Sequence, residues 1–343
     1  MLYPNNLEDK LGFNRIRIEL AENCVSNLGV GFVKKIKFSN SKRNIDKWLS
    51  QTHEFVHILE SGVLFPNSNY IDFSPYLKRA QVENSFLTEE EFFDLVLSLK
   101  TLDECLGFFK GKEAEYPALV ELTQPIVFDD TIYKRIAVKF DERGKLRDNA
   151  SPRLVEIRIG IQAEQRRLRK VLDGILKSAR KNEFTPEDTS ITVRDGRMVI
   201  PVLAEYKRRV KGFIHGESST GQTVYIEPTE VLEINNEVRE LQYAEKREVI
   251  KILTVLTDTI RPHLDDFEGY VQFLGLIDFI RAKARFALSI GASKPLWSEV
   301  KGFVWKNAKH PILFLSHSDL KKPVIPLNIE LTSSNRILVI SGP

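Results

Sequence analysis

The chain has 343 residues, of which 28% are charged and 42% hydrophobic, and its formal net charge is +3 at pH 7. This composition is typical of a globular protein, and the length allows two or three domains. No stretch approaches the roughly 20 apolar residues of a membrane span, so no membrane partner is expected. The two cysteines, Cys24 and Cys105, do not make a disulfide framework, which favours a reducing cytoplasmic location.

The first part of the chain, residues 1–150, is expected to form a helical core domain. In NIDKWLSQTHEFVHILES the apolar residues recur at helical spacing on one face. Thr88 and Glu91 stand at the spacing of a capping box at the start of a further helix. Prolines separate these segments and indicate short connections.

Residues 151–290 are expected to contain two long helices that return to the core. The first begins with Ser151 as cap and Pro152 at the first helical position. Its apolar residues follow three-and-four spacing and are Leu154, Ile157, Ile161, Leu168, Leu172, Ile175 and Ala179. The second helix carries the apolar residues Val231, Ile234, Val238, Leu241, Ile252 and Leu256. Because neither narrow stripe can be buried alone, the pattern predicts an antiparallel coiled-coil arm of about 30 residues per helix.

A β insert, residues 187–228, separates the two helices. Asp195 and Gly196 form a type I′ turn signal inside SITVRDGRMVIPVL, so this segment predicts a hairpin. The segment VKGFIHGESSTGQTVYIEP predicts a second hairpin that turns near residues 219–221. The arm is therefore expected to end in a small four-stranded antiparallel sheet.

The charge of the chain is unevenly distributed. Between Arg143 and Lys211 there are eighteen Lys/Arg and nine Asp/Glu, a local charge of +9, so the remaining residues carry −6. Such a region is a candidate for polyanion binding. Within the insert we predict that nucleic acid is bound by Arg194, Arg197, Lys207, Arg208, Arg209 and Lys211. The arginines of the first long helix, Arg166, Arg167 and Arg169, fit a solvated helix face equally well.

The sequence pattern of residues 291–343 differs from that of the long helices. GFVWKNAKHPILF and KKPVIPLNIELTSSNRILVISGP are predicted to form short strands separated by prolines. A buried-looking strand followed by Gly342 and Pro343 is typical of the edge of an α/β domain. These residues are expected to be the first strands of such a domain, truncated after Pro343.

Three segments, in this order, resemble the second branch of the MutS family, which lacks the mismatch-recognition and connector domains. They are ASPRLVEIR, TVRDGRMVIPV and GESSTGQTVYIEPTEVLEINNEVRELQYAEKREV. AKHPIL and ILVISGP also resemble the entry to the MutS ATPase domain. The resemblance implies a mainly α fold, in which the two long helices are levers, the β insert is a clamp, and the last strands open a truncated P-loop ATPase domain. It covers essentially the whole chain.

The resemblance also implies what the whole protein would do. It would be an ATPase that uses ATP and Mg²⁺, forms a homodimer through its ATPase heads, and closes clamps on branched or duplex DNA in recombination control or DNA repair, without reading mismatches. A nuclease domain, where the branch has one, would lie beyond this chain. The nucleotide-site residues implied within the chain are His310, Pro311, Gly342 and Pro343, an incomplete site, and Pro311 fits the end of a strand equally well. The P-loop lysine is absent, so the chain alone is expected to hold no cofactor and no catalytic residue.

Two other functions stay open beside this one. The target can be ribosomal RNA, in a protein that rescues stalled ribosomes, because phosphate contacts do not distinguish DNA from RNA. Alternatively, the chain can be a structural coiled-coil protein without nucleotide chemistry.

Two short motifs have other readings. HEFVH, His53 to His57, matches a zinc-protease motif, but its histidines are predicted on a solvent face without a third ligand, and no metal site is expected. GESSTG lacks the spacing of a nucleophilic serine. Its residues Ser218, Ser219, Thr220 and Gly221 are therefore expected to form the tip of a clamp hairpin, with glycine supplying the turn.

Overall fold

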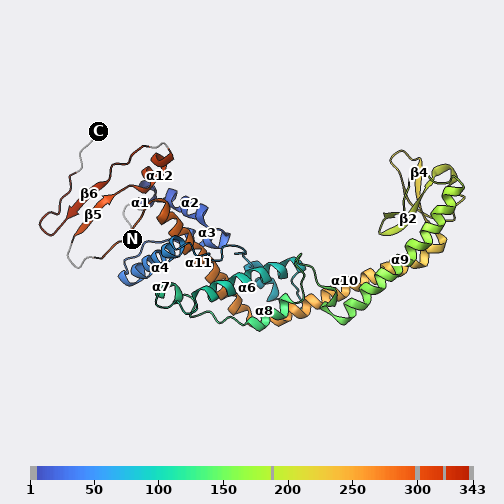
Figure 1. The fold of residues 1–343 in the computed structure, drawn as a ribbon, viewed down its shortest axis with the longest axis horizontal. Coiled ribbons are helices and arrows are strands. Elements are labelled where there is room, and N and C mark those ends of the chain that lie inside the picture. Colours follow the sequence, from blue (N-terminus) through green and yellow to red (C-terminus); the bar gives the residue numbers. More distant parts are fainter. Residues whose placement is uncertain (1–5, 187–188, 298–301, 320–321, 340–343) are drawn as a thin grey trace. The chain divides into compact units, whose positions relative to one another are not determined.

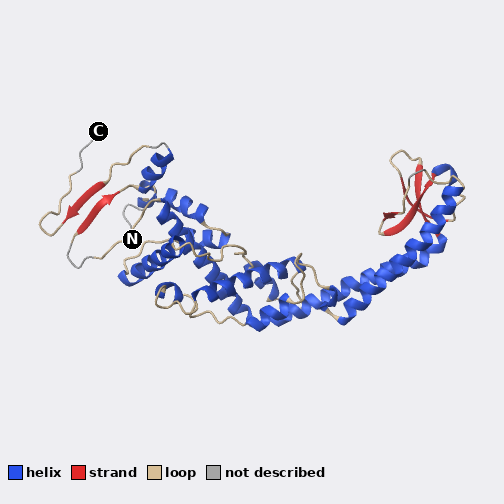
Figure 2. Ribbon diagram, in the orientation of Figure 1, coloured by secondary structure: helices blue, strands red, loops and turns tan. Residues whose placement is uncertain are grey.

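The computed structural model describes residues 6–186, 189–297, 302–319 and 322–339, and it is mainly helical with two small antiparallel sheets (Figures 1 and 2). The predicted fold class is confirmed. Internal contacts divide the chain into two compact units. Unit 1 comprises residues 1–82, 91–133 and 261–343, and unit 2 comprises residues 83–90 and 134–260.

Unit 1 is built around one long helix. Its helices include α1 (Leu7–Lys10), α2 (Phe13–Asn23), α3 (Asn27–Lys34), α4 (Lys42–Glu60), α5 (Ser74–Ala80), most of α6 (Glu89–Phe109), α7 (Pro117–Val120) and α11 (Leu264–Ser289). The helix α11 packs against α2, α3, α4 and α5. It buries apolar residues around its whole circumference, which is the pattern of a helix enclosed by others.

A buried carboxylate ties α11 to the start of α3. Asp278 is fully buried and accepts hydrogen bonds from the backbone N–H groups of Val25 and Ser26, both at 2.9 Å, and from Ser26 Oγ at 2.7 Å. A Cβ atom at Gly29 would lie 2.4 Å from Asp278 Oδ2, so this position requires glycine. The N-terminus of α3, where N–H groups lack helical partners, therefore receives a negative charge.

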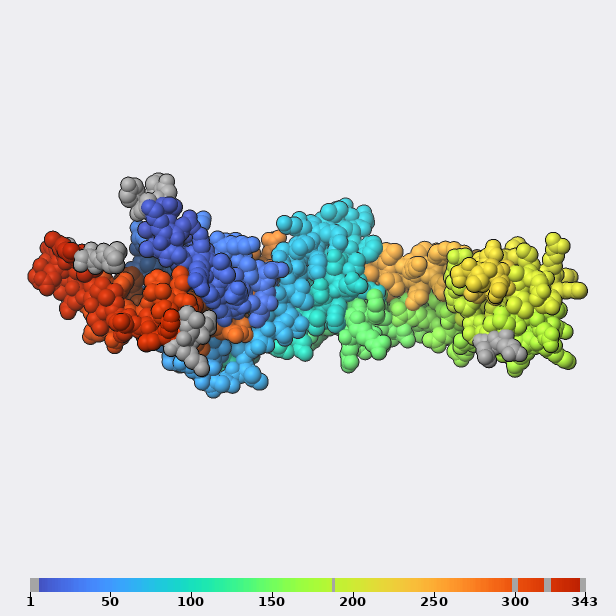
Figure 3. Space-filling model, turned by 90° about the horizontal axis from the view of Figure 1, so that it is seen from above, coloured from blue at the N-terminus to red at the C-terminus, as the bar shows by residue number. Residues whose placement is uncertain are grey.

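Unit 2 contains the two long helices that the sequence predicts. They are α9 (Pro152–Lys181, 30 residues) and α10 (Leu232–Ile260, 29 residues), and they lie side by side, α9 in green and α10 in orange in Figure 3. Ser151 Oγ accepts from Leu154 N at 3.1 Å, so the predicted cap is confirmed. The helix α8 (Asp130–Ala137) and a 3₁₀ turn (Asp148–Ala150) precede α9.

The β insert forms the predicted sheet of four strands. These are β1 (Thr192–Arg194), β2 (Arg197–Leu203), β3 (Gly212–Glu217) and β4 (Thr223–Pro228), in the order β1-β2-β4-β3 with every neighbour antiparallel. Asp195 and Gly196 have φ angles of 48° and 76°, as a type I′ turn requires. One face of the sheet is buried against both long helices, in a core of Leu168, Leu172, Leu176, Ile200, Val202, Val224, Ile226, Val231, Ile234 and Val238.

The last part of the chain differs from the prediction of successive strands. It contains β5 (Phe303–Ala308), α12 (Pro311–Asp319) and β6 (Leu327–Leu331), and β5 pairs with β6. Pro311 begins a helix, because a first helical residue needs no backbone N–H donor. Within ILVISGP, residues 337–339 are not in a strand and Ile337 is 85% exposed, since no described segment pairs with them. Residues 340–343 lie outside the described residues.

Candidate nucleic-acid interface

Four cations lie together in the connection between β2 and β3. Lys207, Arg208, Arg209 and Lys211, called the insert cations below, are all exposed. A 3₁₀ turn, Ala204–Tyr206, precedes them, and Arg209 N donates to Tyr206 O at 2.8 Å. Within the described residues, none of their charged groups lies within 4.0 Å of a carboxylate. Their charges are therefore available to an external polyanion.

Arg197 has a different environment from the insert cations. Its Nη1 lies 2.6 Å from Glu227 Oε1, and its Nη2 donates to Asn236 Oδ1 at 2.6 Å. The other oxygen of Glu227 is 2.7 Å from His215 Nε2, and the Glu227 side chain is only 1% exposed. The charge of Arg197 thus neutralises a buried carboxylate inside the insert, which does not favour the predicted contact with nucleic acid.

Arg194 is exposed on β1 and lies over an aromatic ring. Its guanidinium carbon is 4.2 Å from the centre of the Tyr225 ring on β4. The register explains the contact, because Arg194 opposes Arg197 and Tyr225 opposes Pro201, which places both side chains on one face. The ring holds Arg194 in place by a cation–π contact and leaves its hydrogen-bond donors uncommitted to a carboxylate.

The positive charge of this region lies mainly outside the insert. Residues 187–228 contain six Lys/Arg and six Asp/Glu and are therefore neutral overall. The helix α9 contains nine Lys/Arg and three Asp/Glu, a charge of +6, whereas α10 contains four and six, a charge of −2. The charge of +9 over residues 143–211 therefore comes mainly from α9 and not from the insert, a difference that the sum over the whole region does not show.

The tip of the second hairpin of the β insert is a closed turn. Ser218 N donates to Thr223 O at 2.8 Å, Thr223 N donates to Ser218 Oγ at 3.2 Å, and Gly221 has a φ of 68°. The Ser218 and Thr220 hydroxyls lie 3.3 Å apart. Ser219, Thr220 and Gly221 are exposed. The hydroxyl of Ser218 is used to shape the turn, which favours the structural interpretation over a nucleophile.

The HEFVH segment lies on α4 with both histidines exposed. His53 Nε2 and His57 Nε2 are 3.2 Å apart. Glu54, which a zinc hydrolase would use to activate water, instead accepts from Ala118 N at 3.0 Å and Leu119 N at 2.9 Å. Its carboxylate satisfies the first N–H groups of α7, so its role is structural.

The residues proposed for nucleotide binding are only partly described. Gly342 and Pro343 lie outside the described residues. His310 is exposed, and its Nδ1 accepts from Leu313 N at 3.4 Å at the start of α12. A cavity of about 250 Å³ beside α12 is lined by Lys309, Phe314, Lys322, Pro323 and Val324, and by neither His310 nor Pro311. An adenine contact through His310 and Pro311 stays a prediction.

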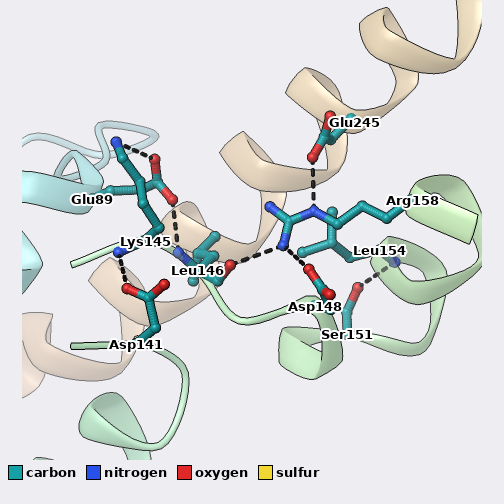
Figure 4. Close-up of polar contacts among 9 residues, drawn as sticks. All are labelled: Glu89, Asp141, Lys145, Leu146, Asp148, Ser151, Leu154, Arg158 and Glu245. Carbon is teal, nitrogen blue, oxygen red and sulfur yellow. Dashed lines mark hydrogen bonds and ion pairs between the residues drawn. The ribbon is translucent and has the colours of Figure 1, made fainter. Parts of the chain in front are cut away.

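A larger cavity, of about 980 Å³, lies at the base of the arm within unit 2. Arg158 is one of the residues that line it. Its Nε donates to Glu245 at 2.7 Å, and its Nη1 donates to Asp148 at 2.6 Å and to Leu146 O at 2.9 Å (Figure 4). Burial lowers the pKa of Arg158, but the hydrogen bonds to the two carboxylates outweigh it and raise the pKa above its usual value. Because the partners of Arg158 are up to 87 residues away, helical periodicity gave no signal for this site.

Comparisons with known proteins give one consistent result. No protein-family model matches the chain. The endonuclease MutS2 of Halalkalibacterium halodurans is 30% identical over 337 residues, and that of a Geobacillus species is 31% identical over 337 residues. Both matches cover 97% of this chain. The chain is related to the MutS2 branch of the MutS family. The resemblance predicted from the sequence is confirmed.

The similarity covers a limited share of the relatives. The chain spans 42% of the length of these two MutS2 proteins, and 41% of that of Alkaliphilus oremlandii, which is 31% identical over 335 residues.

No helix among the described residues is both long and apolar enough to cross a membrane.

Proposed function

We propose that this chain is the part of a MutS-type DNA-repair or recombination protein that binds the nucleic-acid backbone without reading sequence. The observation that carries the proposal is the group of four insert cations, exposed and without carboxylate partners, in an insert whose sequence resembles a MutS clamp. Cations that neutralise phosphates release counterions and supply the sequence-independent part of binding.

The insert cations lie between two strands of a sheet that is packed on the end of the helical arm. The clamp sheet shares its hydrophobic core with α9 and α10, so the sheet and the two helices move together. In the whole protein, ATP and Mg²⁺ would control this arm, and the ATPase heads would pair two copies. The described residues do not include a phosphate-binding loop, and His310 and Pro311 form the start of a helix.

The test is a salt titration of binding to duplexes of unrelated sequence. Replacing all four insert cations by alanine should flatten the slope of log affinity against log salt concentration by roughly 3 to 4 units, about 0.9 per lost phosphate contact. A matched control replaces four exposed cations of α10, Arg239, Lys246, Arg247 and Lys251, and should leave the slope nearly unchanged. Melting temperatures of all three proteins check folding.

The outcome separates the candidate functions. If the wild-type chain shows no salt-dependent binding to any duplex, the proposal is wrong and a structural coiled-coil role gains support. Adding ribosomes as competitor distinguishes the two nucleic-acid targets. Ribosomes and unlabelled duplex are compared as competitors at the same concentration of nucleic-acid phosphate. If ribosomes displace the bound duplex at a far lower concentration than unlabelled duplex does, the ribosome is favoured as the target.

A further inference from the structure

The distal half of α9 carries an excess of positive charge on its solvent face. At about 100° per residue, a set of its basic residues falls within an arc of about 120°. We call this set the α9 stripe; it consists of Arg166, Arg169, Lys170, Lys177 and Lys181, all exposed. Asp173 is the only acidic residue of residues 166–181 in the same arc.

The stripe points away from the packed side of the helix. Leu168, Leu172 and Ala179 are buried on the other side, and the two leucines contact the clamp sheet and α10. Among the described residues, Arg166 Nε donates to Gln162 O of its own helix, at 3.1 Å. Two neighbouring cations are committed elsewhere: Arg180 donates to Thr189 O, and Arg167 pairs with Glu164 at 3.3 Å. The stripe is thus a face that protein contacts leave open.

The stripe has a net positive charge. Arg166 and Lys170, and likewise Lys177 and Lys181, are like charges four residues apart, whereas Asp173 stands four residues from both Arg169 and Lys177. With five cations and one carboxylate, this face carries a charge of +4. The partner helix α10 does not share this pattern, since acidic residues outnumber basic ones there. A helix face with an excess of four positive charges favours an anionic ligand.

We infer that the α9 stripe binds the phosphodiester backbone of a nucleic-acid duplex and extends the clamp contact along the arm. This inference rests on the proposed function. From Arg166 to Lys181 the helix rises about 22 Å at 1.5 Å per residue. A duplex presents one charge per roughly 1.7 Å of its axis, so about 13 phosphates lie within that length. Five cations can therefore each reach a phosphate, and such contacts carry no sequence information.

The test compares four-fold variants of the full 343-residue chain. The stripe variant carries Arg166→Gln, Arg169→Gln, Lys170→Gln and Lys177→Gln, since glutamine keeps a good helix propensity. The control variant carries glutamine at Arg239, Lys246, Arg247 and Lys251 of α10, which removes the same charge from the same arm. Binding is measured by fluorescence anisotropy against DNA and RNA duplexes at several salt concentrations, and helix content by circular dichroism.

The stripe variant should lose roughly 3 to 4 units of salt slope, and the control variant less than about 1. Equal losses in both variants would show a general charge effect and overturn the inference. The inference would also be overturned if the stripe variant kept the wild-type slope while the variant with alanine at all four insert cations lost it. That result would leave the proposed function standing. No binding by the wild-type chain would overturn both. Comparing the DNA duplexes with the RNA duplexes shows which backbone the chain prefers.

Discussion

Replacing Arg197 by methionine tests whether this residue stabilises the β insert or contacts nucleic acid. In the structure, the side chain of Arg197 is 15% exposed and that of Glu227 is 1% exposed, with 2.6 Å between Nη1 and Oε1. Removing one partner of a buried ion pair costs about 3–5 kcal/mol, because the other charge stays buried. Since His215 still contacts the second oxygen of Glu227, we expect the low end of that range, about 3 kcal/mol.

The assay must report on the β insert alone, because a chain of two units has no single free energy of unfolding. Amide hydrogen exchange in β2 and β4 gives the local free energy of opening, and it should fall in Arg197→Met while exchange in α11 is unchanged. Glu227→Gln should also destabilise the sheet. The double variant should lose less than the sum of the single losses, because the two side chains interact directly.

The salt slope of duplex binding is the second measurement. If Arg197 is structural, the slope of a folded Arg197→Met protein stays within the error of the wild type. A loss of local stability below about 0.5 kcal/mol, together with a slope lower by about 1 unit, would refute the reasoning. Arg197 would then be the phosphate contact that its charge alone suggests.

Two further predictions concern unit 1. Asp278→Ala leaves the N–H groups of Val25 and Ser26 without their carboxylate acceptor, which should lower the local free energy of opening of α3, measured by amide hydrogen exchange, by about 3 kcal/mol; exchange in α3 equal to that of wild type would contradict this. Burial lowers the pKa of Lys283 from 10.5 to about 8. Between these two values the unfolded chain binds more protons than the folded one, so wild-type stability should rise with pH relative to Lys283→Met. A stability difference that stays constant from pH 7 to 10 would contradict this second prediction.

Local patterns predicted the elements that depend on local chemistry. The three-and-four spacing from Leu154 to Ala179 fixed one side of α9, and Asp195-Gly196 fixed the turn of the first hairpin, because each depends only on neighbouring residues. The α9 stripe follows from the same helical period, yet summing charge over residues 143–211 concealed it.

Contacts between distant residues could not be predicted in this way. Arg197 meets Glu227 and Asn236, which are 30 and 39 residues away, and no single-sequence pattern distinguishes it from the exposed insert cations. The contact between Ser26 and Asp278 spans 252 residues. The segment ILVISGP reads as a strand from its β-branched residues, but a strand also needs a hydrogen-bonded neighbour, which the described residues do not supply for residues 337–339.

The shared core at the end of the arm affects how the β insert can be separated from the helices. By connectivity the insert is a loop between two antiparallel helices, so its ends enter and leave at neighbouring points. By packing it is not separable, because Leu168, Leu172 and Leu176 of α9 and Ile234 and Val238 of α10 are covered by the sheet. Excising the sheet would expose these five side chains as one apolar strip, and arms without their sheet would associate through it. Recombining this insert with another arm therefore requires transferring these five helix positions with it.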